Sequence, residues 1–368
     1  MEASREPSHR SGKGARKLRG LPVCVFARNC CSGSALACPE MDLSVAFMGT
    51  GGSVPTARRA TACVLIRAGG ARLLIDCGEG AQRQLMRSLG LVSVDDIFLT
   101  HFHADHYLGL PGLLKTYDLH GRERPLRILG PRGLEDLYSS LGRILGRVSY
   151  PVELVEMDPG DEVEFEGFGM HGFPVEHRVE AFGYALIEPE RPGRFDPAAA
   201  RDLGVEDERD FGRLQRGQVV KVRSGEVRPE QVLGESRPGR RVVVTGDTRP
   251  SSLTSAAARG AQLLIHDSSF SDADAERAVE TGHSTAREAA TLADESGVEM
   301  LALVHISTRY RVGDVLEEAR EVHENTIAPR DFDLVEIPYP ERGSPVLLPN
   351  GAREAPTEKA AGAGETED

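Results

Sequence analysis

The chain has 368 residues, of which 40% are hydrophobic and only 5% aromatic, so it can bury a large core built mainly from aliphatic side chains. No apolar run approaches the roughly 20 residues that a membrane span needs, so no membrane-spanning helix is predicted. The formal net charge of −13 argues against a broadly basic surface for nucleic acid.

The first 40 residues differ in composition from the rest of the chain. They are net basic and hold four of the six cysteines, at a spacing that fits no C-x-x-C zinc pair. They lack a continuous apolar core and a convincing cleavage site, so no signal peptide is expected. We expect residues 1–40 to be a disordered basic extension, or an upstream start assigned in error, because Met41 opens a strand. A basic RNA-binding arm is the alternative.

The remaining chain is acidic and poor in lysine. Only five lysines occur in the sequence, and arginine supplies the other basic charges. Such surfaces suit molar salt, where the Debye length is about 3 Å, so we infer a halophilic source; full stability at low KCl would contradict this. Cys63 and Cys77 are far apart and have hydrophobic neighbours. Nothing requires an oxidising compartment, and we expect a cytoplasmic protein.

The predicted elements begin with an alternating strand over 42–48. Two strands joined at Gly69-Gly70 follow over 62–76. Next in the chain are a helix over 79–90, a strand over 95–100, a helix over 108–121, strands over 126–130, 152–157, 161–175 and 183–188, strands over 241–247 and 261–267, a helix over 284–297 that opens with a Thr285–Glu288 capping box, a strand over 300–307 and a helix over 313–326. Several short strands precede a helix, and this pattern then recurs along the chain. It favours an α/β sandwich in which two mixed sheets face each other and helices cover the outside.

Two segments do not follow this pattern of strands and helices. Residues 189–238 are rich in Pro, Gly, Arg and acids, with little apolar periodicity. A stretch of this length inside a compact domain is either functional or disordered. Residues 351–368 are of low complexity, and we expect a disordered tail.

The stretch "LTHFHADHYLGLPG" places four metal-ligating side chains directly after the strand at 95–100. They are His101, His103, Asp105 and His106. Imidazole and carboxylate groups at this spacing suit Zn²⁺ or another divalent ion of borderline softness. Because ligands in a short turn can face two neighbouring points, a two-metal site is plausible.

Further ligands for such a site are available at the ends of other predicted strands. His177 precedes the strand at 183–188, Asp247 ends "VVVTGD", and His305 follows "LALV". A carboxylate between two cations can bridge them, and Asp247 is the candidate for that bridge. Each residue alone is a weak signal, because a terminal His or Asp is more often a cap or turn residue, but their common placement strengthens the group.

These stretches resemble the ribonuclease Z family of the metallo-β-lactamase superfamily, whose members trim the 3′ ends of precursor tRNA. H-x-H-x-D-H occurs throughout the superfamily, whereas "RPGRFD", "GHSTA" and "HISTRY" together are far more specific to this family. The similar stretches lie between about 42 and 310 in the family's order: "FMGTGGSVPT", "LLIDCGEGAQRQL", "THFHADHYLGLPGLL", "HRVEAFGY", "ERPGRFD", "GDTRP", "HDSSF", "GHSTA" and "VHISTRY".

The resemblance implies a four-layer αββα sandwich over 41–350, with a flexible arm inserted at 189–238. It implies two Zn²⁺ ions per subunit, although other divalent ions remain open. One ion would be held by His101, His103, His177 and Asp247, and the other by Asp105, His106, His305 and the shared Asp247.

Catalytic roles follow from the same resemblance. Asp105 would also act as the general base that orients the attacking water, and His283 of "GHSTA" would protonate the leaving 3′ oxygen. Asp267 of "HDSSF" would hold that histidine. Ser307 and Arg309 of "HISTRY" would grip the scissile phosphate.

In this family the arm grips the body of the tRNA from the neighbouring subunit of a homodimer. The expected phosphate contacts are therefore Arg194, Arg213, Arg216, Lys221 and Arg223.

The resemblance implies a zinc-dependent endoribonuclease that acts on precursor tRNA and leaves a 3′-hydroxyl on the tRNA and a 5′-phosphate on the trailer. Two alternatives stay open: another phosphodiesterase or thioester hydrolase of the superfamily, and a metal-holding RNA-binding protein without catalysis.

Overall fold

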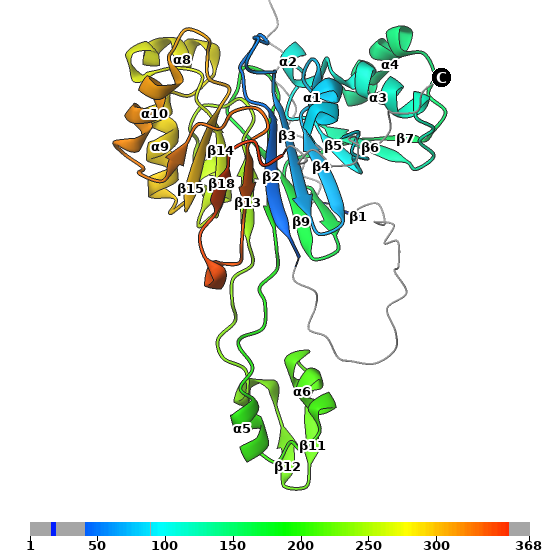
Figure 1. The fold of residues 1–368 in the computed structure, drawn as a ribbon, viewed down its shortest axis with the longest axis vertical. Coiled ribbons are helices and arrows are strands. Elements are labelled where there is room, and N and C mark those ends of the chain that lie inside the picture. The colour runs from blue at the N-terminus through cyan, green and yellow to red at the C-terminus, as the bar shows by residue number, and fades with distance from the viewer. Residues whose placement is uncertain (1–15, 20–40, 89, 353–368) are drawn as a thin grey trace, which may run out of the picture.

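Two mixed sheets dominate the protein in a computed structural model that describes residues 16–19, 41–88 and 90–352 (Figure 1). Each sheet contains eight of the described strands. The first has the order β18 (Val346–Leu348), β17 (Leu334–Glu336), β2 (Leu43–Gly49), β3 (Cys63–Ala68), β4 (Ala71–Ile75), β5 (Asp96–Phe98), β6 (Leu126–Gly130) and β7 (Val152–Glu156). The second has the order β1 (Lys17–Arg19), β8 (Glu162–Phe165), β9 (Phe168–Pro174), β10 (Phe182–Ile187), β13 (Arg241–Val244), β14 (Leu263–Asp267), β15 (Met300–Val304) and β16 (Thr326–Ile327).

Helices cover the outer face of each sheet, which confirms the expected four layers (Figure 1). The first sheet carries α1 (Ala81–Ser88), α3 (Leu110–Leu119) and α4 (Leu134–Leu145); the second carries α7 (Ser252–Ala258), α9 (Ala286–Glu295) and α10 (Val312–Arg320). The short helices α2 (Ala104–Tyr107) and α8 (Ala275–Thr281) lie in connections, as do three 3₁₀ turns, η1 (Pro229–Gln231), η2 (Asp272–Asp274) and η3 (Pro340–Arg342). Every helix of the described residues is too short or too polar to cross a bilayer.

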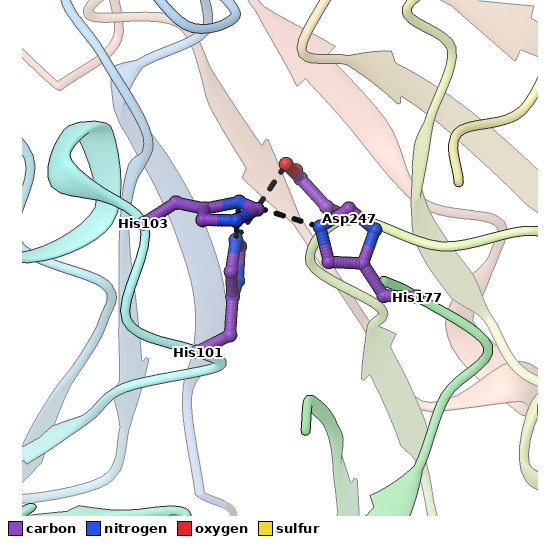
Figure 2. Close-up of side chains that lie close together, drawn as sticks. All are labelled: His101, His103, His177 and Asp247. Carbon is purple, nitrogen blue, oxygen red and sulfur yellow. Dashed lines mark hydrogen bonds and ion pairs between the residues drawn. The ribbon is translucent and has the colours of Figure 1, made fainter. Parts of the chain in front are cut away.

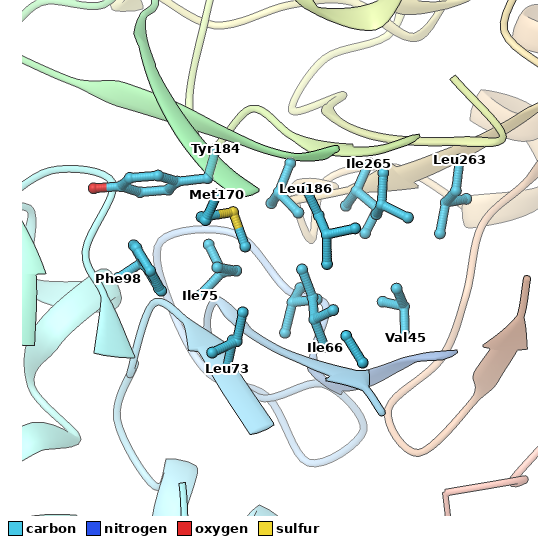
Figure 3. Close-up of a cluster of buried hydrophobic side chains, with 14 of the residues drawn as sticks. Val45, Ile66, Leu73, Ile75, Phe98, Met170, Tyr184, Leu186, Leu263 and Ile265 are labelled. Atoms are coloured by element: carbon cyan, nitrogen blue, oxygen red, sulfur yellow. The ribbon is translucent and has the colours of Figure 1, made fainter. Parts of the chain in front are cut away.

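The central core fills the space between the sheets. Figure 3 shows side chains such as Ile66 and Leu73 of the first sheet facing Leu186 and Ile265 of the second. Burying each large aliphatic side chain contributes roughly 1.5–3 kcal/mol, so this layer holds the two sheets together. The Tyr184 hydroxyl also donates to a backbone carbonyl at the end of β5, 2.7 Å away. The core thereby braces the segment that leads into the histidine cluster.

Parallel pairing brings several strand ends to one edge. β4 to β7 run parallel in the first sheet, and β13 to β16 run parallel in the second. Because the carboxyl ends of parallel strands meet at the same edge, the loops after them lie close together. The histidine cluster follows β5 at this edge, where Figure 1 places α2.

The structure differs from the sequence predictions in several elements of the body. The strand predicted over 161–175 is two strands, β8 and β9, because the chain reverses at Gly167, whose φ of +89° suits glycine. Helices α4, α7 and α8 and strands β16, β17 and β18 lie in segments where no such element was predicted. Residues 17–19 form β1 beside β8, where Arg16 pairs with Asp161 at 2.6 Å. The rest of the prediction for 1–40, and that for the tail beyond residue 352, lie outside the described residues.

Residues 189–238 form an arm with a folded head, whose helices and hairpin were not among the predicted elements. The head contains α5 (Pro197–Asp202), α6 (Glu208–Gln215) and the hairpin of β11 (Val220–Val222) and β12 (Gly225–Val227). Its own small core holds the buried side chains of Ala200, Val205, Leu214, Val220, Val227 and Val232. The apolar residues are spread over several very short elements, so no single window shows a period.

The arm leaves the body at the ends of β10 and β13 that lie away from the histidine cluster (Figure 1). Glu341 fixes its base: its two carboxylate oxygens accept hydrogen bonds from Arg191, each at 2.8 Å, and one also accepts from Arg237 at 2.8 Å. The Arg191 guanidinium also lies 3.7 Å from the centre of the Tyr339 ring. These contacts set the direction in which the arm projects.

Candidate metal centre and catalytic site

The seven predicted metal ligands converge on one place in the fold. Their ligand atoms form groups in which all lie within 4.8 Å of one another: His101, His103, His177 and Asp247 in one, and Asp105, His106 and His305 in another. A third group of Asp247, His283 and His305 connects the two. These residues come from the loops after β5, β9, β13 and β15, so the shared sheet edge assembles them.

The first group is drawn in Figure 2. The His101 Nε2 atom lies 2.9 Å from Nδ1 of His103, and His177 Nε2 lies 3.3 Å from the same nitrogen. Asp247 approaches through its Oδ2 atom, 3.7 Å from His101 Nε2. Four donor atoms thus face a common point.

The second group meets the other carboxylate oxygen of Asp247. Asp247 Oδ1 lies 3.4 Å from Nε2 of His106 and 3.4 Å from Nε2 of His305. Asp105 Oδ2 lies 3.5 Å from Nε2 of His106 and 3.1 Å from Nε2 of His305. Asp247 therefore presents one oxygen to each group, as a bridging ligand would.

Hydrogen bonds behind the ligands orient three of the rings. His106 Nδ1 bonds Asp76 at 2.7 Å, His305 Nδ1 bonds the Ser269 hydroxyl at 2.7 Å, and His177 Nδ1 bonds the carbonyl of Gly282 at 2.7 Å. Partners of this kind set the tautomer and leave Nε2 toward a metal. Neither Asp76 nor Ser269 was among the predicted functional residues. Both lie close to strand ends and within stretches that resemble the family, "LLIDCGEGAQRQL" and "HDSSF".

Backbone conformation also distinguishes this site. Asp76 and His305 adopt positive φ values of 59° and 61°, although neither is glycine. Such conformations cost about 1–3 kcal/mol each and persist where surrounding contacts enforce them.

The donor set fits a pair of divalent cations. His106 Nε2 is buried and has no hydrogen-bond partner among the described residues, as expected for an atom reserved for a metal. Burial lowers the pKa of His305, but Asp247 and Asp105 outweigh this and raise it to about 9. Burial raises the pKa of Asp247, but His305 and His106 hold it well below its usual range. Cations would displace the protons that the carboxylates otherwise hold on these rings.

His283 and Asp267 form the predicted pair beside the metal ligands. His283 Nδ1 lies 2.8 Å from Asp267 Oδ2, so the shorter aspartate side chain reaches the ring. Asp267 also accepts hydrogen bonds from the Ser269 hydroxyl at 2.7 Å and from the Thr248 amide at 3.1 Å. Burial lowers the pKa of His283, but the bond to Asp267 raises it above its usual value overall.

Other contacts hold the backbone of His283. The capping box of α9 is present, because Glu288 N donates to the Thr285 hydroxyl and Thr285 N donates to the Glu288 carboxylate. Arg249 bonds the same Glu288 and also donates to the His283 carbonyl at 2.7 Å. The predicted cap therefore fixes the loop that carries His283.

The remaining predicted residues lie farther from the ligand cluster. Ser307 is partly buried and follows His305 by two positions, whereas Arg309 is exposed and its side chain makes no ion pair with a described carboxylate. All five predicted arm contacts are exposed in or near the arm head: Arg194, Arg213, Arg216, Lys221 and Arg223. Arg213 pairs with Asp210 at 3.0 Å.

The chain is similar to known enzymes over most of its length. A family model described as the metallo-beta-lactamase superfamily matches residues 56–281. Ribonuclease Z of Methanosarcina mazei is 46% identical over 302 residues, which cover 81% of this chain and 99% of that protein. Ribonuclease Z of Natronomonas pharaonis is 45% identical over 82% of this chain and 100% of that protein.

Solved structures agree with these similarities. Human tRNase Z, short form, superposes with a TM-score of 0.57 and 27% identity over 80% of this chain and 99% of that one. The metallo-beta-lactamase fold protein YhfI of Bacillus subtilis has a TM-score of 0.60 at 19% identity over 81% of this chain and all of that one, and shows the fold alone. The chain belongs to the ribonuclease Z family of the metallo-β-lactamase superfamily.

Proposed function

We propose that this protein is a zinc-dependent endoribonuclease that removes the 3′ trailer from precursor tRNA. The reaction hydrolyses one phosphodiester and leaves a 3′-hydroxyl on the tRNA and a 5′-phosphate on the trailer. The observation that carries the proposal is a ligand cluster shared through Asp247 and flanked by the His283–Asp267 pair, in a chain 46% identical to a protein named Ribonuclease Z.

Two Zn²⁺ ions per subunit would occupy the two ligand groups, with Asp247 common to both. Such a pair neutralises an anionic phosphodiester and lowers the pKa of bound water from 15.7 to about 7 in the best-known case. Histidine-rich donor sets with carboxylates are typical of zinc, although other divalent ions share this preference.

Asp105 and His283 take the two proton-transfer roles in the proposal. Asp105 is held by the amide of Ser53, which donates to its Oδ2 at 2.9 Å, so the carboxylate is oriented to accept a proton from the attacking water. His283 uses Nδ1 for Asp267, which leaves Nε2 to donate to the leaving 3′ oxygen. The anionic partner favours the protonated ring that a general acid needs.

Ser307 and Arg309 would hold the scissile phosphate, because both follow His305 within four residues. The exposed Arg309 guanidinium is available for a phosphate oxygen.

The arm would grip the tRNA body through Arg194, Arg213, Arg216, Lys221 and Arg223. It projects away from the sheet edge that carries the metal ligands of its own chain (Figure 1). An arm and a site that contact the same RNA are therefore best supplied by different subunits, which supports a homodimer. A cytoplasmic location is consistent with Cys63 and Cys77, which are free and buried within the described part of the chain.

Cleavage of one precursor tRNA, with and without chelator and with the cut mapped, tests the proposal. We expect a metal-dependent cut at the start of the trailer. Activity confined to a small phosphodiester or a thioester would favour another hydrolase of the superfamily.

The His283→Ala variant separates an enzyme from a non-catalytic RNA-binding protein. It should abolish cleavage and preserve tRNA binding. Unchanged cleavage by this variant would remove His283 as the proton donor.

A further inference from the structure

A second feature lies beside the metal ligands and has no part in the proposed chemistry. It is a cavity of about 1200 Å³, bounded by the loop at 55–60, helix α1, the start of α10 and residues 328–332. Five arginines line it, and we call it the arginine cavity: Arg58, Arg59, Arg83, Arg87 and Arg330.

One wall of the arginine cavity is continuous with the candidate metal centre. Ser53 N donates to Asp105, and a Cβ added at Gly52 would lie 2.6 Å from the His305 carbonyl oxygen. Only two residues after Ser53, the same loop lines the cavity from Pro55 onward. A polymer lying across the metal ligands can therefore continue into the cavity without leaving the protein surface.

Asp331 fixes this wall in place. Its Oδ1 accepts from Thr50 N at 3.1 Å, and its Oδ2 accepts from Ala60 N at 2.7 Å and from the Gln84 amide at 2.8 Å. Asp331 is buried, and its charge also acts on Arg59, whose side chain donates to the Thr50 hydroxyl at 2.6 Å and to the Pro329 carbonyl at 2.9 Å. Of the other lining residues, Glu79 carries the one further acidic side chain.

Most of the positive charge of the arginine cavity is not paired with an acidic side chain. Among the described residues, none of its five arginines makes an ion pair with a carboxylate, although arginines elsewhere do so, as Arg127 does with Asp96 at 2.5 Å. The side chains of Arg83 and Arg330 are exposed and make no hydrogen bond within the described part of the chain. In a protein with 57 acidic and 44 basic residues, five guanidinium groups around one cavity, two of them without a hydrogen-bond partner among the described residues, point to an anionic ligand.

The size of the cavity and the residue type identify the chemistry of that ligand. Guanidinium groups match phosphate oxygens in geometry and charge. The volume exceeds the roughly 300–1,000 Å³ of pockets for small molecules, which suits a chain segment carrying several phosphates. We propose that the arginine cavity binds backbone phosphates of the RNA strand next to the scissile bond. This inference rests on the proposed function.

The test compares the double variant Arg83→Gln/Arg330→Gln with the wild type. Binding of a precursor tRNA is measured against KCl concentration by fluorescence anisotropy, with catalysis blocked by chelator. Each lost phosphate contact makes the slope of log K against log salt shallower by about 0.7 for single strands and 0.9 for duplex. We expect a change of about 1.4 to 1.8 for the pair. The Arg83→Lys/Arg330→Lys variant keeps the charge and should keep the slope.

Two controls separate this inference from the proposed function and from misfolding. Arg143→Gln removes an exposed arginine on α4, outside the cavity lining, and should leave the slope unchanged. Hydrolysis of bis(p-nitrophenyl) phosphate should be the same in all variants, because this diester is too small to reach from the candidate metal centre into the arginine cavity. Failure of the wild type to cleave precursor tRNA would refute the proposed function.

If the double Gln variant keeps the wild-type slope while the wild-type protein cleaves precursor tRNA, the proposal for the arginine cavity is refuted and the proposed function is not. Repeating the measurement with trailers of increasing length locates the bound strand. If the loss of slope in the double Gln variant grows with trailer length, the trailer lies in the cavity. If the loss is the same at every length, the tRNA side of the scissile bond lies there. Both results support phosphate binding. Equal effects of free inorganic phosphate on wild type and variant, with no change in RNA slope, would count against it.

Discussion

The head of the arm allows its proposed role to be tested without touching the metal ligands. Leu214 is fully buried in the small core of the head, against side chains from the hairpin of β11 and β12. A Leu→Ala change in a core costs about 2–5 kcal/mol. A core of this size rarely supplies more than about 3–5 kcal/mol, so Leu214→Ala should leave the head close to unfolded.

The body should not respond to this change. The two strands of the stalk that connects it to the head pair through isolated bridges, Arg191 with Arg237 and Phe195 with Leu233. The main thermal transition and the hydrolysis of a small diester should therefore match the wild type.

Limited trypsin digestion measures opening of the head, because exposed Arg213, Arg216, Lys221 and Arg223 are cleavage sites. When cleavage follows the open population, a loss of 2 kcal/mol or more raises its rate at least about 30-fold. The KM for precursor tRNA should rise in parallel.

The control is Val219→Ala, because Val219 is 42% exposed and lies in the same head. Its effect on stability should stay within about 0.5 kcal/mol. An unchanged trypsin rate in Leu214→Ala would refute the argument about the core. A faster trypsin rate with an unchanged KM would refute the role of the arm in gripping RNA.

Three further predictions follow from other contacts. Asp247→Ala should reduce bound zinc, measured by mass spectrometry, from two ions per chain to fewer than one, because Asp247 faces both ligand groups; retention of one full ion would contradict the bridge. Glu341→Gln should raise the KM for precursor tRNA and spare small-diester hydrolysis, because it frees the base of the arm; an unchanged KM would show that this anchor is dispensable. Burial raises the pKa of Asp161, but Arg16 lowers it overall, so their pairing stabilises the fold above the ordinary aspartate pKa of about 3.9 and is lost as pH falls through the lowered value. The difference in Tm between wild type and Arg16→Ala should accordingly be largest near neutral pH and shrink toward pH 3; a constant difference would contradict the pairing.

Local sequence patterns were sufficient for the elements that surround the site. The turn at Gly69-Gly70, the strand into the histidine cluster and the Thr285–Glu288 cap are all present, because each depends on residues within a few positions of one another. The candidate ligand residues could also be predicted from the sequence, since metal ligands are restricted to a few side-chain types and these residues lie at strand ends.

Tertiary structure decided what those residues contact. The bonds of His106 to Asp76 and of His305 to Ser269 join segments 30 and 36 positions apart, and no local spacing specifies such partners. The arm head was missed for a related reason: its core draws one or two apolar residues from each of several short elements, and only folding brings them together. The residue types in the sequence therefore determined which chemistry is available. Long-range strand pairing determined where those residues meet, with one oxygen of Asp247 toward each ligand group.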